Sequence, residues 1–252
     1  MKKYFLFLLS IFQLGASFSQ IVNIESQRIH TDTTGFDGTL EGGFSVNQNN
    51  TLLVSATATA HAQYKTKKDL YMLVGNWRFT NGGASRFVND GMAHFRYNHK
   101  FLDWLSVEAF GQVQYNQLLD LRLRTLVGFG PRFKILNKKW IHLYAATLYM
   151  FEYERQAISD TAEYNNRMSS YISWTIEPNP HFSFIATTYY QPKLTDWADF
   201  RISGNYALKF KVFKRFAFKV EFNFLYDSAP PPNITKFVFN GTTGIVFNLR
   251  KN

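Results

Sequence analysis

The histidines and carboxylates of this chain are the first candidates for chemistry. No two histidines stand at the H-x-x-x-H spacing that puts two ligands on one helix face, and there is no cysteine. We therefore expect no metal and no cofactor. His94 with Glu108 could form a base and its orienting carboxylate, but no serine beside them has an evident claim as nucleophile, although Ser106 shares their face. We expect no enzyme, and a barrel hydrolase is the least favoured alternative.

The remaining charged side chains alternate with apolar ones. Between residues 216 and 226 the even positions are all apolar, whereas the odd positions include Lys219 and Glu221. Segments 200–210 and 237–249 alternate in the same way. A period of two is typical of a β-strand with one apolar and one polar face. The charges must therefore be positioned by strands.

Alternation of this kind predicts about twelve strands, each near the ~9–11 residues that a tilted membrane strand needs. They are expected near 36–47, 51–64, 69–79, 89–98, 104–116, 121–134, 139–153, 164–177, 181–190, 200–210, 216–226 and 237–249. Ten or fourteen strands are the alternatives, because the region before Asp69 alternates least clearly. Tight turns are expected near 99–103, 136–138, 178–180 and 213–214. Longer polar loops are expected near 81–88, 154–163, 191–198 and 227–234.

The N-terminus has the pattern of an export signal. Lys2 and Lys3 precede an apolar run that is too short to span a bilayer as a helix, and small residues precede Gln20. We expect 1–19 to be a signal peptide, 20–35 a periplasmic lead-in and 36–252 the barrel. Cleavage would remove two of 28 basic residues and none of 18 acids, so the net charge becomes 26 − 18 = +8.

The composition favours a membrane sheet over a soluble one. Aromatic residues make up 18% of the chain, including 26 Phe, and charged residues only 18%, which argues against disorder. Every backbone polar group in hydrocarbon must be paired within the protein, so a membrane sheet closes on itself. We expect an all-β fold, a transmembrane antiparallel up-and-down β-barrel of a Gram-negative outer membrane. The rival is an exported β-sandwich, which also alternates but rarely needs so many phenylalanines on one side.

The polar faces of the strands would line the lumen of such a barrel. Hairpin geometry places His94 opposite Glu108, Arg122 opposite Glu152, and Arg132 opposite His142, with Arg167 near Glu152. The charges form either an ion-paired filling that holds the barrel in shape or a constriction that selects anions. The expected lumen-lining residues are His94, Arg96, Asn98, Glu108, Gln112, Arg122, Arg124, Arg132, His142, Glu152, Arg167, Arg201, Lys209, Lys219 and Glu221.

The last segment resembles the closing-strand signal read by the barrel assembly machinery. Gly244, Phe247 and Leu249 carry this resemblance, although Arg250 and two further residues follow. The expected partners are this machinery, outer-membrane lipid, lipopolysaccharide and a further envelope protein. Nucleic acid is not expected, because the basic residues alternate with apolar ones and do not form one continuous face.

Three motifs resemble a known family. His94-Phe95-Arg96-Tyr97-Asn98, Glu108-Ala109-Phe110-Gly111-Gln112 and the stretch 123–130 follow the order H-x-R-Y-N, E-x-F-x-Q and R-x-L-x-G-x-G. This resembles the domain of unknown function 481 family of bacterial proteins. The resemblance implies an outer-membrane β-barrel without an established function and brings no catalytic residues. Gly128 and Gly130 would point inward and let Phe110 or Arg96 lie across them, which favours a structural role.

Three functions remain open from the residues alone. The first is a small passive channel with a basic, anion-preferring lumen. The second is a non-conducting structural or accessory barrel that docks another envelope protein, and the third is the hydrolase. Lumen side chains that close the water path would favour the second.

Overall fold

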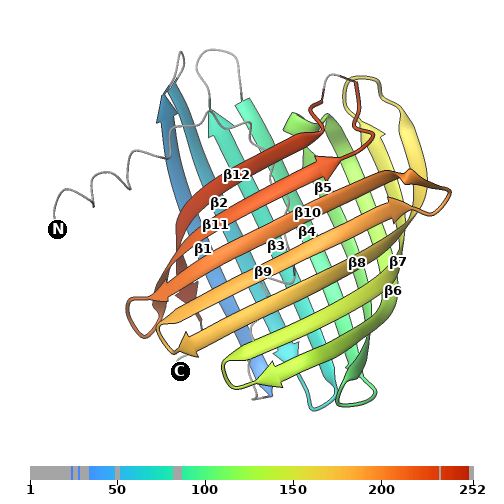
Figure 1. The fold of residues 1–252 in the computed structure, drawn as a ribbon. Coiled ribbons are helices and arrows are strands. Elements are labelled where there is room, and N and C mark those ends of the chain that lie inside the picture. The colour runs from blue at the N-terminus through green and yellow to red at the C-terminus, as the bar shows by residue number, and fades with distance from the viewer. Residues whose placement is uncertain are drawn as a thin grey trace.

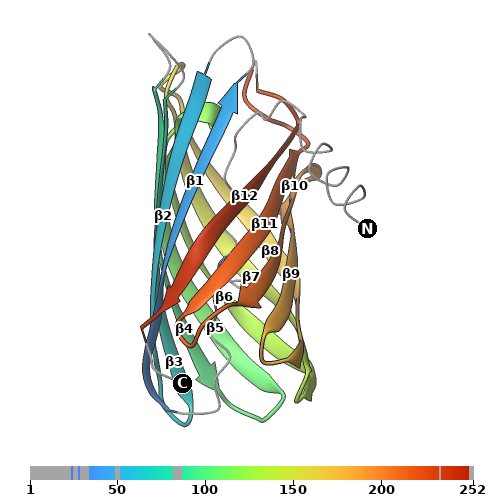
Figure 2. The ribbon, with the colours of Figure 1, turned by 90° about the vertical axis from the view of Figure 1, so that its left-hand side faces the viewer.

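A single closed sheet contains nearly all of the chain that is described here. The computed structural model describes residues 24, 28, 34–48, 52–81, 87–232 and 234–249, so the expected signal peptide lies outside the described residues. Twelve antiparallel strands pair in chain order, and the first pairs with the last (Figures 1 and 2). Within these residues, no helix is long and apolar enough to cross a membrane.

The predicted number of strands is confirmed. The strands are β1 (Gly35–Gln48), β2 (Leu52–Lys65), β3 (Asp69–Asn81), β4 (Phe87–Lys100), β5 (Leu105–Asn116), β6 (Leu121–Lys138), β7 (Ile141–Gln156), β8 (Ala162–Asn179), β9 (Phe182–Lys193), β10 (Asp196–Lys211), β11 (Phe216–Asp227) and β12 (Phe237–Asn248), with a short 3₁₀ helix, η3 (Gln117–Leu119). Figure 2 shows β1 beside β12, where the barrel closes.

One predicted loop is wrong. Residues 191–198 do not form a long polar loop, because β9 continues to Lys193 and β10 begins at Asp196. The pairing of these two strands shifts register between Asp196 and Phe200. A bulge of this kind interrupts the period of two, so the alternation ends before the strand does.

The two faces of the sheet differ as the alternation predicts. Large apolar side chains such as Phe44, Phe129 and Ile245 are more than half exposed on the outside, at 64%, 59% and 58%. Buried polar and charged side chains occupy the inside. A soluble protein seldom exposes so many large apolar groups together. The outer face therefore suits hydrocarbon, and the inner face encloses the charges.

The two ends of the barrel are also distinct. Connections 66–68, 101–104, 139–140, 180–181 and 212–215 lie at the end that we name the turn end, which is at the bottom of Figure 1. Connections 117–120 and 157–161 lie at the opposite end, which we name the loop end. Asp120 joins the two loop-end connections, because its side-chain carboxylate accepts hydrogen bonds from the backbone of Ala157 and Ile158.

Candidate functional site: a charged lumen and its basic vestibule

A fully buried carboxylate on β5 organises the lower part of the lumen. Glu108 has no exposed surface, and arginines from three parts of the chain surround it. The contacts are Arg28 Nη2 at 3.0 Å, Arg132 Nε at 3.4 Å and Arg96 Nη1 at 3.7 Å, with hydrogen bonds from Asn98 at 2.5 Å and Tyr171 at 2.8 Å. We name this group the Glu108 cluster. Tyr171 belongs to β8, so the cluster crosses the lumen.

A second buried carboxylate, on β7, organises the upper part. Glu152 contacts Arg201 Nη1 at 2.6 Å, Arg167 Nε at 2.8 Å and Arg124. Arg201 continues to Asp227 of β11 at 2.7 Å. We name this group the Glu152 cluster. Its contact between Arg167 and Glu152 confirms the proximity that was predicted from the sequence.

Both clusters exclude solvent. Glu108 and Glu152 are 0% exposed, and Arg96 and Arg167 are almost completely buried. Buried charges are tolerated only when they are paired and hydrogen-bonded with good geometry, which arginine forks provide. The clusters therefore brace the barrel across its lumen and narrow it at two levels.

Apolar side chains fill the space between the clusters on one side. Phe110, Leu126, Leu148, Met150 and Tyr171 form a buried group on β5 to β8. A cavity of about 90 Å³ lies beside them. The lumen is therefore densely packed along these four strands.

The motif glycine on β6 makes this packing possible. A Cβ placed on Gly128 would lie 2.6 Å from Cζ of Phe110 and 2.8 Å from the carbonyl oxygen of Tyr149. Real Cβ atoms do not approach other atoms so closely, so the Phe110 ring lies across this position only because glycine has no side chain. This is the arrangement expected from the motif.

Smaller polar groups line the opposite wall. Lys219 of β11 is held between Glu41 of β1 and Glu221, and the neighbouring Asn205 and Asn223 share a hydrogen bond of 2.6 Å. These residues come from β10, β11 and β1, which lie on the two sides of the seam where β1 pairs with β12. The lumen thus has a packed side and a polar side.

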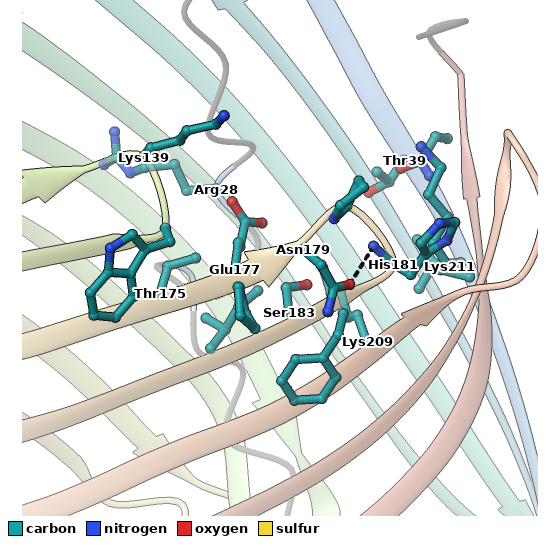
Figure 3. Close-up of a pocket in the computed structure, with 18 residues that line it drawn as sticks. Arg28, Thr39, Lys139, Thr175, Glu177, Asn179, His181, Ser183, Lys209 and Lys211 are labelled. Atoms are coloured by element: carbon teal, nitrogen blue, oxygen red, sulfur yellow. Dashed lines mark hydrogen bonds between the residues drawn. The ribbon is translucent and has the colours of Figure 1, made fainter.

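The turn end opens into a wide basic mouth, which we name the vestibule. One cavity of about 960 Å³ includes Arg28, Lys139, Lys209 and Lys211 with Glu177 as its one carboxylate among the described residues. In the view of Figure 3, Glu177 lies between Arg28 and Lys139 on one side and Lys209 and Lys211 on the other. Positive charge therefore dominates this mouth.

A second vestibule cavity of about 500 Å³ is more basic still. Its described carboxylates are Asp69 and Glu177. Arg28, Lys139 and Glu177 also line the first cavity, so the two are neighbours. The basic residues that line the second cavity are Arg28, Lys65, Lys67, Lys68, Lys100, Arg132, Lys134, Lys138 and Lys139.

Most of the residues predicted to line the lumen face it. Those buried inside are His94, Arg96, Asn98, Glu108, Arg132, Glu152, Arg167, Arg201, Lys219 and Glu221. Gln112 and Arg124 line the cavity between the clusters, and Lys209 and His142 line the vestibule.

The prediction that Arg122 lines the lumen is wrong. Its side chain is 59% exposed and pairs with Asp160 of the 157–161 connection, 3.0 Å away, instead of lining the lumen. The pairing of β6 with β7 shifts register between Leu121 and Leu123. This bulge places Leu121 inside in place of Arg122, which the period of two could not indicate.

The predicted pairing of His94 with Glu108 is also wrong. His94 lies opposite Gln112, and its Nδ1 is 2.8 Å from the Gln112 side-chain oxygen, while Asn98 lies opposite Glu108. The midpoint of that pair is residue 103, two residues beyond the expected turn centre at Phe101. An even displacement keeps every side chain on its face but changes its partner.

The next hairpin shows the same displacement. Arg124 lies opposite Glu154, so the turn centres on residue 139 instead of Asn137. Consequently Arg132 lies opposite Ala146, and a further register shift between Lys134 and Leu136 places His142 opposite Asn137. The predicted pairs of Arg122 with Glu152 and of Arg132 with His142 are therefore wrong.

Two residues of the expected lead-in lie inside the barrel. Ile24 is buried against Met72, Val74 and Met92, and Arg28 belongs to the Glu108 cluster. Sequence reasoning missed both, because no alternation links them to a strand. The periplasmic placement of 20–35 as a whole stays a prediction.

The residues of the expected assembly signal close the barrel. Gly244 lies opposite Lys219 of β11 and Gly43 of β1, and a Cβ there would lie 2.8 Å from the carbonyl oxygen of Gly42. Phe247 packs on Phe216 with ring centroids 5.0 Å apart. Leu249 follows β12 and is partly exposed. Recognition by the assembly machinery stays a prediction.

Metal binding finds no support among the described residues, where no three His, Asp or Glu side chains gather as a metal site would require. The site consists of arginines, lysines and carboxylates. Such groups can attract, hold and exclude ions, and they can brace a wall.

Two solved structures are similar to this chain. A NanC porin structure superposes with a TM-score of 0.51 at 13% identity, covering 84% of this chain and 98% of that chain. At this identity the likeness shows the barrel fold alone. A KdgM porin structure has a TM-score of 0.49 at 11% identity, covering 85% of this chain and 99% of that chain. No curated protein matches the sequence. A family model described as protein of unknown function, DUF481, matches residues 40–248.

Proposed function

The chain belongs to the DUF481 family, and we propose from its lumen that it is a small passive outer-membrane channel with a preference for anions. The vestibule is the observation that carries this proposal. Nine lysines and arginines but only two described carboxylates line its 500 Å³ cavity. Fixed charge of one sign in a concave, low-dielectric mouth raises the local concentration of the opposite ion.

The deeper lumen would extend the same preference. Arg28 and Arg132 line the vestibule and also reach Glu108, so a solute that enters meets arginine side chains next. The Glu108 and Glu152 clusters narrow the passage, which limits it to small solutes. Lys209 faces the vestibule and makes no ion pair with a described residue.

The outer face supports placement in the outer membrane. Its exposed apolar side chains suit lipid, and Trp104 and Trp140 lie exposed near the turn end, where aromatic rings mark a membrane interface. Short turns face the periplasm in such barrels, so the vestibule would open to the periplasm. Lipopolysaccharide would then contact the loop end.

A non-conducting structural barrel is the second candidate, and a specific observation favours it. Glu108 and Glu152 are both 0% exposed, so water does not reach the two carboxylates around which the lumen is narrowed. If the clusters close the lumen completely, the barrel would serve as a scaffold for another envelope protein. We propose no catalytic role for any residue.

Single-channel recording separates the two candidates. The purified mature protein would be inserted into planar bilayers under a potassium chloride gradient, and the reversal potential would be measured. We expect discrete steps in the current and a reversal potential that is displaced toward the equilibrium potential of chloride. Absence of conductance at every voltage, in protein that is shown to be folded by circular dichroism, would reject the channel and leave the scaffold.

A further inference from the structure

Several buried polar atoms without partners lie on one wall of the lumen. Both ring nitrogens of His61, Oε1 of Glu41, Oδ1 of Asn205 and both amide atoms of Asn240 have no hydrogen-bond partner among the described residues. His61, Asn205 and Asn240 are nearly completely buried. All four residues belong to β1, β2, β10 and β12, which are neighbours around the closure of the barrel.

The presence of several unpartnered polar atoms on one wall has a physical explanation. Buried polar groups in folded proteins are almost always hydrogen-bonded, either to protein or to water, because an unmade bond is costly. A single orphan group is unremarkable, but several on one wall point to a site that water occupies. On the opposite side of the lumen, Nε2 of His94 is also unpartnered and lies beside the 90 Å³ cavity, whereas Met150 and Leu148 pack within an apolar group.

The same wall has room for water. Gly43, Thr57, Thr242 and Gly244 line a cavity of about 40 Å³ beside Glu41 and Lys219. This volume exceeds the ~10–15 Å³ that one water molecule needs. Gly43 lies opposite both Thr57 and Gly244, so three small inward-facing residues occur side by side on β2, β1 and β12. Small side chains keep this part of the wall open.

The wall is continuous with the vestibule. Thr39 and Lys209 line the 960 Å³ cavity. Glu41 is the next inward-facing residue after Thr39 on β1, and Lys219 lies directly opposite Lys209. Beyond Lys219, Asn205, Asn223 and Asn240 face one another across β10, β11 and β12. A row of polar groups thus leads from the mouth toward the loop end.

We propose that water and small inorganic anions travel along this wall, formed by β10, β11, β12, β1 and β2, and not through the apolar group that contains Met150 and Leu148. This inference rests on the proposed channel function and names its route. Lys209 and Lys219 are the residues that an anion on this route would meet first. The Glu108 cluster then braces the opposite part of the lumen, and the Glu152 cluster reaches this wall through Arg201 and Asp227.

The absence of native cysteine makes the route directly testable. Thr242→Cys and Asn240→Cys would be compared with Met150→Cys and Leu148→Cys in the full-length mature barrel reconstituted in liposomes. Each variant would be exposed to the anionic reagent sulfonatoethyl methanethiosulfonate, and the labelled fraction would be followed by mass spectrometry. Circular dichroism would verify the fold of each variant.

We expect the two cysteines on the polar wall to react about tenfold faster or more, since a thiol in water ionises and one in apolar packing does not. Labelling does not require conductance, so a silent barrel that labels in this pattern would reject the channel but keep the hydrated wall. Equal labelling of all four positions, faster labelling at Met150, or no labelling on the polar wall of a folded barrel would overturn the inference.

Discussion

Arg28 and Glu108 are separated by 80 residues in the chain and joined by a contact of 3.0 Å in the lumen. Arg28 precedes the first strand, yet its guanidinium also reaches the side-chain oxygen of Asn98 at 3.0 Å. It lines both cavities of the vestibule. This one side chain therefore links the vestibule to the other residues of the Glu108 cluster.

Arg28→Ala should raise the single-channel conductance and weaken the anion preference. The change removes both bulk and positive charge at the inner end of the vestibule. Glu108 keeps Arg96 and Arg132 within 4.0 Å, so the barrel should remain folded. Lys236→Ala, an exposed change near the loop end, is the matched control and should leave both properties unchanged. Unaltered conductance in Arg28→Ala would show that Arg28 does not obstruct the passage.

Vestibule charge should set ion selectivity. Lys138→Glu combined with Lys139→Glu reverses two charges at the turn end, and both side chains line the 500 Å³ cavity. Because a negatively charged mouth attracts cations, the reversal potential should move toward the equilibrium potential of potassium. Lys236→Glu at the loop end should produce a smaller shift. An identical reversal potential in the double variant would count against the vestibule as the selectivity element.

Removing the carboxylate of Glu152 should destabilise the barrel strongly. Glu152→Gln leaves Arg124, Arg167 and Arg201 without their shared buried counter-charge. Loss of one partner from a buried ion pair typically costs ~3–5 kcal/mol. The free energy of unfolding would be measured by urea titration in detergent or lipid. Glu163→Gln, which is exposed on β8, should change this free energy by less than ~0.5 kcal/mol.

Gly128 of the family motif and Gly111, which stands at a variable position of the second motif, should respond differently to the same change. Gly128→Ala places a Cβ against Phe110 and the Tyr149 carbonyl, and overpacking of this kind costs ~1–3 kcal/mol. A Cβ on Gly111 meets no atom within 4 Å, so Gly111→Ala should be tolerated. Urea unfolding measures both. Equal stabilities would contradict the packing role assigned to Gly128.

A loop-end ion pair should make one connection sensitive to acid. The hydrogen bond from Arg155 holds the pKa of Asp160 below its usual value of 3.8, with Arg122 adding to the effect. Because the pKa of Asp160 is lowered, its ion pair with Arg155 is present above the usual pKa. The ion pair is lost as the pH falls through the lowered pKa. Hydrogen exchange in the 157–161 connection should therefore stay slow near pH 4 and accelerate below it. Asp160→Asn should remove this dependence, and a variant that retains it would exclude Asp160 as the cause.

The faces of the strands were predictable from the sequence because alternation is a local property. His94, Arg96 and Glu108 lie inside, as the period of two indicates, and Phe129 and Ile245 lie outside. The exceptions have local causes that the period does not record. The bulge at Leu121 to Leu123 moved Arg122 outward, and the bulge before Phe200 hid the start of β10.

Partners were less predictable than faces. A turn centred two residues later exchanged Glu108 for Gln112 as the neighbour of His94, although both residues stayed inside. The residues of this turn do not strongly favour a centre at residue 103 over one at residue 101. The register was settled by the pairing of each strand with both of its neighbours.

The sequence by itself determined that this chain is a barrel with an apolar exterior and a charged interior, because period-two alternation needs only neighbouring residues. The tertiary structure alone decided which charges meet. Closure brings Tyr171 to Glu108 from 63 residues away and Lys219 to Glu41 from 178 residues away. It also decided that one side of the lumen is packed and the other polar, since that division depends on which distant strands face each other across the enclosed space.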